Sequence, residues 1–312
     1  MSPEASLAAF VETERARVDR ALDTFLPSPP GVPPLLADAM RYAVFAGGKR
    51  LRPVLALAAA DAVAGPGADA AARELALPAA CAIELIHTYS LVHDDLPAMD
   101  DDSMRRGKPT AHVRFGEGIA ILAGDGLLTE AFALMARAPE VEGRPALTAR
   151  KLRVLALVAN AAGAAGMVGG QTIDLELAGA AGPVPTCDAD GLRAMHARKT
   201  GALIRAAACA GAVMAGADTG TIAAVDAYAN ELGLAFQITD DILDVEGTAG
   251  TLGKTAGKDA AAGKPTYPAL HGLETSRRLA ADCVSRAHAA LARAGLGGQL
   301  GALADWVLAR SS

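Results

Sequence analysis

Aspartates gather at the ends of two apolar stretches of the chain, a pattern that points to divalent-metal chemistry. They are Asp94, Asp95, Asp100, Asp101 and Asp102 after "LIHTYSLVH", and Asp240, Asp241 and Asp244 after "LGLAFQIT". Carboxylates with no cysteine beside them suit Mg²⁺ better than zinc. A single acidic run at a helix end is typical of a solvated surface turn. Two runs of the same form are harder to explain in that way, because negative charge near a helix C-terminus opposes the helix dipole.

The spacing in the second run places two carboxylates on one side of a helix. Asp240 and Asp244 are four residues apart in the sequence, so they lie about 40° apart on a helix face, whereas Asp241 points about 100° away from Asp240. Two carboxylates about 4 Å apart repel by about 4 kcal/mol at an effective dielectric constant of about 20. We therefore expect a compensating cation beside Asp240 and Asp244.

In the first run a proline brings two distant aspartates together. Asp94 and Asp100 are six residues apart, which on a regular helix would place them about 120° apart. Pro97 cannot donate the helical hydrogen bond and biases Leu96 away from helical geometry. We expect the helix to end or kink near Leu96, so that Asp100 folds back toward Asp94.

Glycine-rich basic segments could supply the partners of a phosphate. Mg²⁺ held by few carboxylates usually also takes ligand phosphates, and a phosphate site needs fixed cations. The segments are "GGKRLRP" (47–53), "RRG" (105–107), "RKTG" (198–201) and "LGKT" (252–255). The last is not a P-loop, because that motif needs a glycine five positions before Gly253 and Thr248 stands there. Residues 246–266 are rich in glycine and lysine and are expected to form a mobile lid that carries cations.

The composition predicts that helices position these groups. Hydrophobic residues make up 52% of the chain and aromatic residues only 4%, and the abundant alanine and leucine favour helix. Residues 5–26 have helical spacing of apolar side chains, and "AGPGAD", "RAPEVEGRP" and "GAAGPVPTCDAD" divide the alanine-rich runs after residue 34. We find no strand alternation, no domain linker and no internal repeat. The prediction is an all-α bundle of about ten or more helices, with residues 1–312 as a single domain.

Charge, cysteines and hydropathy exclude several classes of protein. The net charge of −6 argues against a nucleic-acid partner. The four cysteines have no CxxC spacing and are interpreted as reduced, mostly buried thiols of an intracellular protein, and the N-terminus lacks an apolar signal core. Residues 154–173 carry no charge but are rich in glycine. We interpret them as a buried, closely packed core helix, because a membrane span needs about 20 strongly apolar residues.

Taken together, these motifs resemble those of the trans-isoprenyl diphosphate synthases, most closely the bacterial farnesyl diphosphate synthases (geranyltransferases). The resemblance covers about residues 45–270, and the insertion Pro97-Ala98 in the first acidic motif is typical of the bacterial type. The matching stretches are "GGKRLRP", "IHTYSLVHDDLPAMDDDSMRRGKPTAH", "GMVGGQTIDLE", "HARKTGALIRAA", "LAFQITDDILDVEG" and "TLGKTAGKDAAAGKPTYPAL". It implies the isoprenoid synthase fold, a bundle with a deep central cavity and the two acidic motifs facing each other across its mouth.

The resemblance also assigns roles to residues. It implies three Mg²⁺ ions, two held by Asp94 and Asp100 and one by Asp240, with Asp244 and Asp241 in support. These ions would bind the diphosphate of an allylic substrate, and cationic side chains would grip it as well. Those side chains are Arg105, Lys199 and Lys254, with Lys264 as a helper. The diphosphate of the second substrate, isopentenyl diphosphate, would bind to Lys49, Arg52, His87 and Arg106.

The activity implied is a head-to-tail condensation of isopentenyl diphosphate with dimethylallyl or geranyl diphosphate, by ionisation, condensation and elimination. Thr200 and Gln237 would steady the allylic carbocation. Tyr89 lies five residues before Asp94, about 7.5 Å lower on a helix, and would form a floor that stops the chain at farnesyl diphosphate. The resemblance further implies a cytoplasmic homodimer without a membrane span.

Other interpretations of the sequence stay open. A geranylgeranyl or geranyl diphosphate synthase would use the same motifs, and a non-catalytic subunit of a heteromeric synthase would share the fold. A terpene cyclase has no need of a second-substrate site such as Lys49, Arg52 and His87. Lys49 and Arg52 could be ordinary surface cations, and His87 could be a hydrogen-bonded core histidine, the role that we assign to His93.

Overall fold

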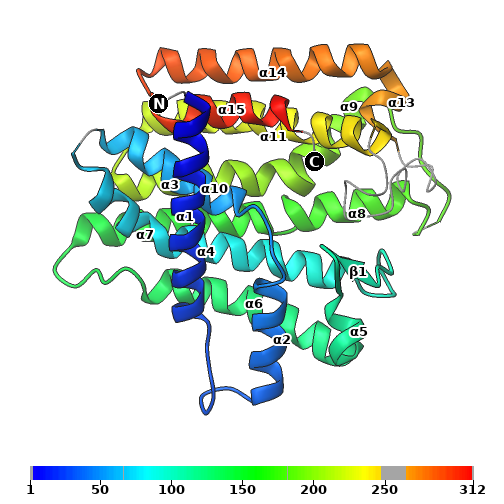
Figure 1. Ribbon diagram of the computed structural model, residues 1–312, viewed down its shortest axis with the longest axis horizontal. Helices are drawn as coiled ribbons and strands as arrows, with labels where there is room; N and C mark the ends of the chain where they lie inside the picture. The colour runs from blue at the N-terminus through cyan, green and yellow to red at the C-terminus, as the bar shows by residue number, and fades with distance from the viewer. Residues whose placement is uncertain (1–2, 66, 181, 247–264, 311–312) are drawn as a thin grey trace.

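The computed structural model describes residues 3–65, 67–180, 182–246 and 265–310 (Figure 1). The chain folds as an all-α bundle, as the sequence predicted. In chain order the elements are α1 (Pro3–Phe25), α2 (Pro34–Val44), α3 (Leu51–Ala64), α4 (Asp69–Asp94), β1 (Met104–Arg105), β2 (Lys108–Pro109), α5 (Ala111–Phe115), α6 (Glu117–Arg137), α7 (Pro145–Ala162), α8 (Met167–Leu177), α9 (Ala189–His196), the π-helix η1 (Ala197–Gly201), α10 (Ala202–Ala215), α11 (Thr219–Glu246), α13 (Tyr267–His271), α14 (Leu273–Arg293) and α15 (Gln299–Ala309).

Helix α10 is the most enclosed part of the bundle. It packs against α3, α4, α7 and α11, and every residue from Ala206 to Met214 is buried. Small side chains make this possible, because alanine and glycine let neighbouring helix backbones approach closely. At Gly211 the approach is so close that a Cβ atom would lie 1.9 Å from the carbonyl oxygen of Ala56 on α3.

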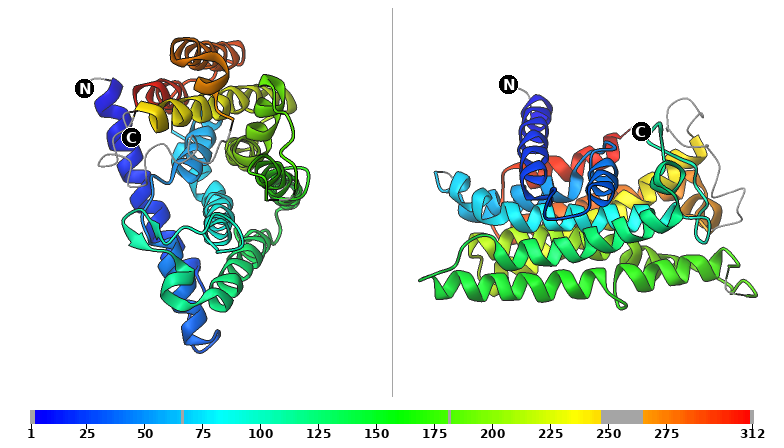
Figure 2. Two further views of the ribbon diagram at one scale, coloured as in Figure 1. Left: turned by 90° about the vertical axis from the view of Figure 1, so that its right-hand side faces the viewer. Right: turned by 90° about the horizontal axis from the view of Figure 1, so that it is seen from below.

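The long helices are roughly aligned, and α1 and α2 run across them. The left view of Figure 2 looks along the aligned helices, with α1 and α2 extended over one side. Buried apolar residues form a core cluster that includes Leu7 of α1, Leu127 of α6, Leu203 of α10 and Val307 of α15. This shared core supports the prediction of a single domain over residues 1–312, which stays a prediction.

The C-terminal ends of α4 and α11 lie at the same end of the bundle. Figure 1 shows the cyan end of α4 and the yellow end of α11 at the right, beside β1, α8, α9 and α13. Residues Asp94 and Asp240 belong to these two ends. The fold therefore brings the two acidic runs to one end of the molecule, although almost 150 residues separate them in the sequence.

Most of the breaks predicted from glycine and proline are confirmed. α1 covers the periodic stretch 5–26 except for Leu26. The ends of α3, α6 and α8 and the starts of α4, α7 and α9 coincide with the three predicted breaks. All four cysteines are free, and Cys81, Cys209 and Cys283 are buried. The sequence missed one small feature, the antiparallel pair formed by β1 and β2. Its turn residues Arg106 and Gly107 both have positive φ angles, as a two-residue hairpin turn requires.

The prediction of one buried helix over residues 154–173 is wrong. Helix α7 ends at Ala162 and α8 begins at Met167. The backbone between them turns at Gly163 and Gly166, where a Cβ atom would meet the preceding carbonyl oxygens. Both helices also bury only one face, and Leu152 and Val168 are exposed.

Three helical stretches among the described residues are long and apolar enough to cross a membrane, judged by length and composition alone. They are Ala70–Asp94, Glu117–Arg137 and Pro145–Leu177, and inside the bundle 78%, 39% and 33% of their most apolar windows are buried. The absence of a membrane span therefore stays a prediction, and the low values for the last two stretches show that α6, α7 and α8 present an apolar outer surface.

The contact between α10 and α3 predicts a large effect of a single methyl group. We expect Gly211→Ala to destabilise the protein by about 1–3 kcal/mol, because the new Cβ would collide with the Ala56 backbone. The control is Gly118→Ala in α6, where nothing lies within 4 Å of the added Cβ, and which should gain up to about 1 kcal/mol of helix propensity. Urea unfolding measures both. Equal stability of the two variants would contradict the packing described.

Candidate active site

The chain turns back on itself directly after α4. The helix ends at Asp94, and the backbone N–H of Asp100 donates to the carbonyl of Asp94 at 2.8 Å, while the N–H of Asp101 donates to the carbonyl of Leu96 at 3.1 Å. Asp101 has a φ of 51°, in the left-handed region that aspartate tolerates. The predicted end of the helix near Leu96, and the return of Asp100 toward Asp94, are confirmed.

This turn holds the Asp94 carboxyl in an unfavourable place for a charge. Burial raises the pKa of Asp94 to about 6; nearby Lys199 and Arg105 oppose the increase, and the carboxylate of Asp100 adds to it. A carboxylate with a raised pKa is one whose charge is insufficiently compensated by the protein itself. A bound cation would supply the missing compensation.

Asp95, the neighbour of Asp94, is already neutralised by the protein. Its side chain is only 3% exposed and accepts hydrogen bonds from Nε of Arg105 at 2.8 and 2.9 Å and from Nη2 at 2.5 Å. This ion pair fastens the hairpin β1–β2 to the end of α4. Arg105 thus lies beside the first acidic run, where the resemblance placed it, but three of its hydrogen bonds go to Asp95.

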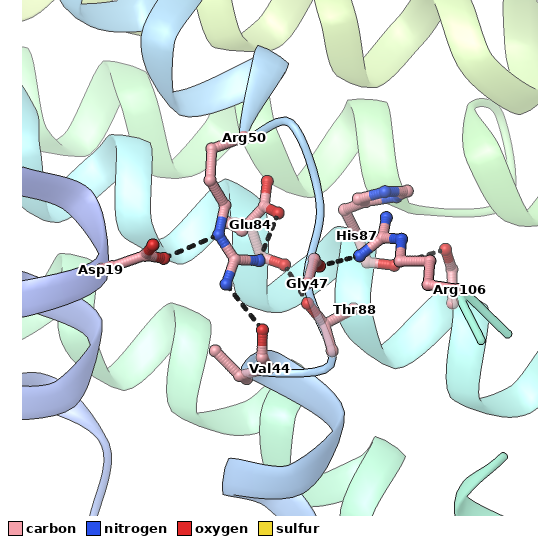
Figure 3. A network of polar contacts seen from close by, with 9 residues as sticks. Asp19, Val44, Gly47, Arg50, Glu84, His87, Thr88 and Arg106 are labelled. Carbon is pink, nitrogen blue, oxygen red and sulfur yellow. Dashed lines mark hydrogen bonds and ion pairs between the residues drawn. The ribbon is translucent and has the colours of Figure 1, made fainter. Parts of the chain in front are cut away.

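The loop "GGKRLRP" is fixed by two arginines (Figure 3). Arg50, which has a φ of 50°, is 4% exposed and donates to Asp19 at 2.9 Å, to Glu84 at 3.0 Å and to the carbonyl of Val44 at 2.7 Å. From the other side, Nη1 of Arg106 donates to the carbonyl of Gly47.

The glycines of this loop let the Arg106 guanidinium approach. Gly48 has a φ of 136°, and a Cβ atom there would lie 2.6 Å from Nη1 of Arg106. The loop and the hairpin therefore meet through a contact that a larger residue at position 48 would prevent. Figure 3 also shows that Arg106 lies close to His87.

Arg52 and His87 line a cavity of about 290 Å³ that reaches from Asp94 to α8 and η1. Burial and the positive charges of Arg52 and Arg106 hold the pKa of His87 well below its usual range. Nε of Arg52 is buried without a hydrogen-bond partner among the described residues. The cavity is lined by Arg52, His87, Tyr89, Ser90, Leu91, His93, Asp94, Met99, Met167, Val168, Gln171, Thr172, Leu175, Lys199 and Thr200.

Six of the fifteen predicted site residues lie in the walls of this cavity. Tyr89 is 7% exposed and its ring meets the His93 ring edge-on, with centroids 5.7 Å apart. His93 in turn is 3.0 Å from the carbonyl of Ile121 on α6, which supports its structural role. Gln237 is not among the lining residues; it lies one turn before Asp241 on α11.

Lys199 and Thr200 are carried by a π-helix, η1, which continues α9 into α10. Single-turn π-helices occur often at functional sites. The η1 backbone packs directly on Gly170 of α8, where a Cβ atom would lie 2.2 Å from the backbone nitrogen of Lys199. The ammonium group of Lys199 lies 2.7 Å from Oδ2 of Asp174 on the same helix α8. Helix α8 therefore fixes both the backbone and the side chain of Lys199.

The sequence reasoning did not single out Asp174 or Gln171. Both stand in "GMVGGQTIDLE", three residues apart on α8. The amide oxygen and nitrogen of Gln171 are buried with no hydrogen-bond partner among the described residues, and this residue lines the cavity. A buried polar pattern within an apolar helix is the signal that could have identified them.

The second acidic run faces a cation that the sequence did not identify. Asp240 lies 2.7 Å from Nη2 of Arg310, whose side chain is 7% exposed and lies over the ring of Phe236 at 4.2 Å. Lys49 is close by, over the ring of Trp306 at 5.6 Å, and burial together with the charge of Arg310 lowers its pKa. A compensating cation beside Asp240 was predicted, but only the fold shows that it comes from the last turn of the chain.

Lys49 also borders a second, larger cavity. This cavity, of about 1050 Å³, lies between α1, α3 and α15, and its other lining residues, such as Leu7, Val54 and Leu303, are outside the predicted site. The four residues predicted to bind isopentenyl diphosphate are thus divided by the structure. Arg52, His87 and Arg106 form one group, and Lys49 lies nearer to Arg310. Lys254, Lys264 and the rest of segment 247–264, which makes up most of the predicted lid 246–266, lie outside the described residues.

The carboxylates are of a kind that fits Mg²⁺. Among the residues that the structure describes, no three His, Cys, Asp or Glu side chains converge as a metal-binding group. Mg²⁺ is seldom held by an all-protein cage, and it usually takes one or two carboxylates together with substrate phosphates and waters. The pairs Asp94 with Asp100, and Asp240 with Asp244, offer such hard oxygen ligands. Their roles as ligands, and the number of ions, stay predictions.

Comparison with known proteins gives the family. A model of the polyprenyl synthetase family matches residues 33–293. The chain belongs to the polyprenyl synthetase family. Members of this family are prenyltransferases, and the chain is a trans-prenyl synthase.

Three known proteins are similar to this chain over nearly its whole length. The farnesyl diphosphate synthase of Escherichia coli (strain K12) is 45% identical over 305 residues, covering 95% of this chain and 96% of that protein. The geranylgeranyl diphosphate synthase of Cyanophora paradoxa is 44% identical over 282 residues, covering 90% and 89%. The crystal structure of an FPP/GFPP synthase from Zymomonas mobilis, in its apo form, has a TM-score of 0.80 at 36% identity, covering 98% of each chain. The isoprenoid synthase fold expected from the sequence is confirmed.

The raised pKa of Asp94 predicts that this residue destabilises the metal-free protein. Its pKa of about 6 in the folded state exceeds the value of about 3.8 for an unfolded chain, so stability should fall as the pH rises between these values. We expect Asp94→Asn to gain about 1–3 kcal/mol at pH 8, and much less at pH 4.5. Urea unfolding in EDTA measures both.

The control for this prediction is Asp101→Asn, on the same turn but exposed. Asparagine tolerates the left-handed conformation of this position, so the stability difference from wild type should stay small at both pH values. A loss of stability in Asp94→Asn at pH 8 would contradict the expected cost of the buried charge.

Proposed function

We propose that the protein is a farnesyl diphosphate synthase, which condenses isopentenyl diphosphate with dimethylallyl and then geranyl diphosphate. One observation carries this proposal: a single cavity has Asp94 at one end, Arg52 and His87 in its wall, and the bulky Tyr89 beside them. Carboxylates for a metal, cations for a diphosphate and an apolar blocking residue are thus combined in one space.

The chemistry follows from charge. Mg²⁺, when bound, would withdraw electrons from the allylic diphosphate and so favour heterolysis of its C–O bond. Asp94, Asp100, Asp240 and Asp244 would hold it. Lys199, fixed by Asp174 at 2.7 Å, would place a positive charge on the leaving diphosphate.

The remaining residues would orient the second substrate and protect the cation. Arg52, His87 and Arg106 would hold isopentenyl diphosphate, and the neutral His87 ring, whose pKa is held low by burial and by these cations, would donate one hydrogen bond without adding charge. The hydroxyl of Thr200 would face the allylic cation, and the side chain of Gln237 would assist from α11. The double bond of isopentenyl diphosphate would attack the allylic cation and form the new C–C bond, so no nucleophilic side chain is needed. Loss of a proton from the resulting cation to the released pyrophosphate would complete the elimination without a side-chain base.

A second candidate function is the synthesis of geranylgeranyl diphosphate. It is favoured by the Cyanophora paradoxa enzyme, which is as similar to this chain as the Escherichia coli enzyme is. Overall similarity therefore does not separate a C15 from a C20 product. The position of Tyr89 in the cavity wall supports the shorter product.

The deciding experiment is incubation of the purified protein with isopentenyl diphosphate and each allylic primer in Mg²⁺, followed by chromatography of the products. Farnesol after phosphatase treatment would support the proposal, and geranylgeranyl products would support the second candidate. No condensation by the isolated chain would overturn both and favour a non-catalytic subunit.

We also propose that the protein acts as a homodimer. Exposed apolar side chains on α6 and α7, such as Ile121, Leu122 and Leu152, support an interface there, since exposed apolar surface is typical of association sites. Sedimentation velocity would test the oligomeric state. The cytoplasmic location expected from the sequence stays a prediction.

The Tyr89 side chain predicts control of product length. We expect Tyr89→Ala to lengthen the main product from C15 to C20 or beyond, because the space that the ring fills would become available to the growing chain. Product chromatography measures the change, with Tyr89→Phe as the control that keeps the ring and should keep C15. An unchanged profile in Tyr89→Ala would contradict the floor assignment.

The acidic runs predict a specific loss of turnover. We expect Asp94→Ala or Asp240→Ala to lower kcat by at least about 10²-fold, the usual order for loss of electrostatic transition-state stabilisation, while circular dichroism stays unchanged. Asp282→Ala, a change at an exposed position of α14 outside the predicted site, serves as the control and should keep its kcat. Near-normal kcat of either first variant in Mg²⁺ would show that the metal assignment is wrong.

A further inference from the structure

The two aspartates of the second run point in different directions and have different surroundings. Asp240 is half-exposed at the Arg310 contact, whereas Asp241 is buried, with 6% of its surface exposed. Consecutive residues on an α-helix are separated by about 100°, so the two carboxylates cannot both face the mouth of the site. The side chain of Asp241 turns inward, between α11 and the elements that pack against it.

The Asp241 carboxylate contacts the first residue of α13. Its Oδ2 accepts a hydrogen bond from the backbone N–H of Tyr267 at 2.9 Å. Tyr267 begins α13, whose N-cap Thr266 also accepts a hydrogen bond, from the N–H of Ala269. One carboxylate of α11 thus fixes the backbone where the chain enters α13.

The same carboxylate lies against the helix that leads into η1. Nε2 of His196 is 3.9 Å from Oδ2 of Asp241, and the His196 ring is stacked on the Tyr267 ring, with centroids 5.9 Å apart and 20° between the planes. His196, Asp241 and Tyr267 are all buried. They join α9, α11 and α13 in one small polar cluster.

His196 directly precedes η1, which carries Lys199 and Thr200. Any movement of His196 relative to α11 would therefore move Lys199 and Thr200 relative to Asp240. Nε2 of His196 has no hydrogen-bond partner among the described residues, so Asp241 restrains His196 through Tyr267: the carboxylate fixes the Tyr267 backbone, and the Tyr267 ring stacks on the His196 ring. A buried carboxylate that lost this donor would pay the desolvation cost of an unsatisfied group.

We infer that Asp241 is a positioning residue: through Tyr267 and His196 it holds α13 and η1 against α11 and so fixes Lys199 and Thr200 relative to Asp240. The inference rests on the proposed function, since it assumes that Lys199 and Asp240 act on one substrate. It assigns to Asp241 the role of a hydrogen-bond acceptor rather than that of a negative charge acting on a metal.

The test separates these two roles with two variants of Asp241, one isosteric with aspartate and one truncated. Asp241→Asn keeps an oxygen that can accept from the Tyr267 N–H but removes the charge, and Asp241→Ala removes both. Asp240→Asn is the matched control, because it makes the same chemical change one residue earlier. Steady-state kinetics at varied Mg²⁺ give kcat and the half-saturating Mg²⁺ concentration, and hydrogen exchange followed by mass spectrometry gives the protection of residues 265–271 in the metal-free protein.

For a positioning residue we expect Asp241→Asn to keep kcat within about threefold of wild type, with an unchanged Mg²⁺ half-saturation. Asp241→Ala should lose kcat by about tenfold or more and exchange the Tyr267 amide about tenfold faster, because its hydrogen bond to a charged group is lost. Asp240→Asn should lose kcat with no change in the exchange of residues 265–271.

Two outcomes would overturn the inference. A fall of Asp241→Asn to the level of Asp241→Ala, with a higher Mg²⁺ requirement, would show that the charge is what matters. Wild-type exchange and kcat in Asp241→Ala would show that the contact positions nothing. If Asp241→Ala does not fold, the Asn variant still decides by its kcat and its Mg²⁺ requirement. If the wild-type protein does not condense the two substrates, this result counts against the proposed function alone. Hydrogen exchange still tests the contact between Asp241 and the Tyr267 amide, because it needs no activity.

Discussion

Carboxylates brought together at one end of a bundle repel one another, and the rest of the site is arranged around that constraint. The protein itself compensates some of this charge, since Asp95 is paired with Arg105 and Asp240 with Arg310. Asp94 is left with a raised pKa, so its charge is only partly balanced. A site of this kind is less stable when empty than when a divalent cation and a diphosphate are present, and this difference is a source of binding energy.

The two acidic runs are built on one plan. In each, one of two adjacent aspartates is buried against another segment and the other points in a different direction, because consecutive helical residues diverge by about 100°. Asp95 fastens the β1–β2 hairpin through Arg105, and Asp241 fastens α13 through the Tyr267 amide. The inner aspartate thus connects the helix to another segment that borders the site, whereas Asp94 lines the cavity and Asp240 contacts Arg310.

Local chemistry was predictable from the sequence, and contacts between distant segments were not. Pro97 determined the end of α4, and the glycine- and proline-rich breaks determined most helix boundaries, since these effects act within a few residues. Arg310 could not be assigned to Asp240, because 70 residues separate them and only the packing of α15 on α11 joins them. The false single helix over 154–173 arose because its glycines were interpreted as close-packing positions within one helix, whereas the backbone breaks between α7 and α8 at Gly163 and Gly166.

The length of the product cannot be inferred from overall sequence similarity. Relatives named as a farnesyl and as a geranylgeranyl diphosphate synthase are almost equally similar to this chain, at 45% and 44% identity, so overall similarity does not follow the length of the product. In the proposed function the space left for the hydrocarbon tail sets the product length, and the Tyr89 ring in the wall of a cavity of about 290 Å³ limits that space. Tyr89 is held by the core on one side and by the His93 ring, 5.7 Å away, on the other. Since His93 is itself anchored to α6, the Tyr89 ring has little freedom to swing aside, and the proposal of a C15 product depends on this fixed ring.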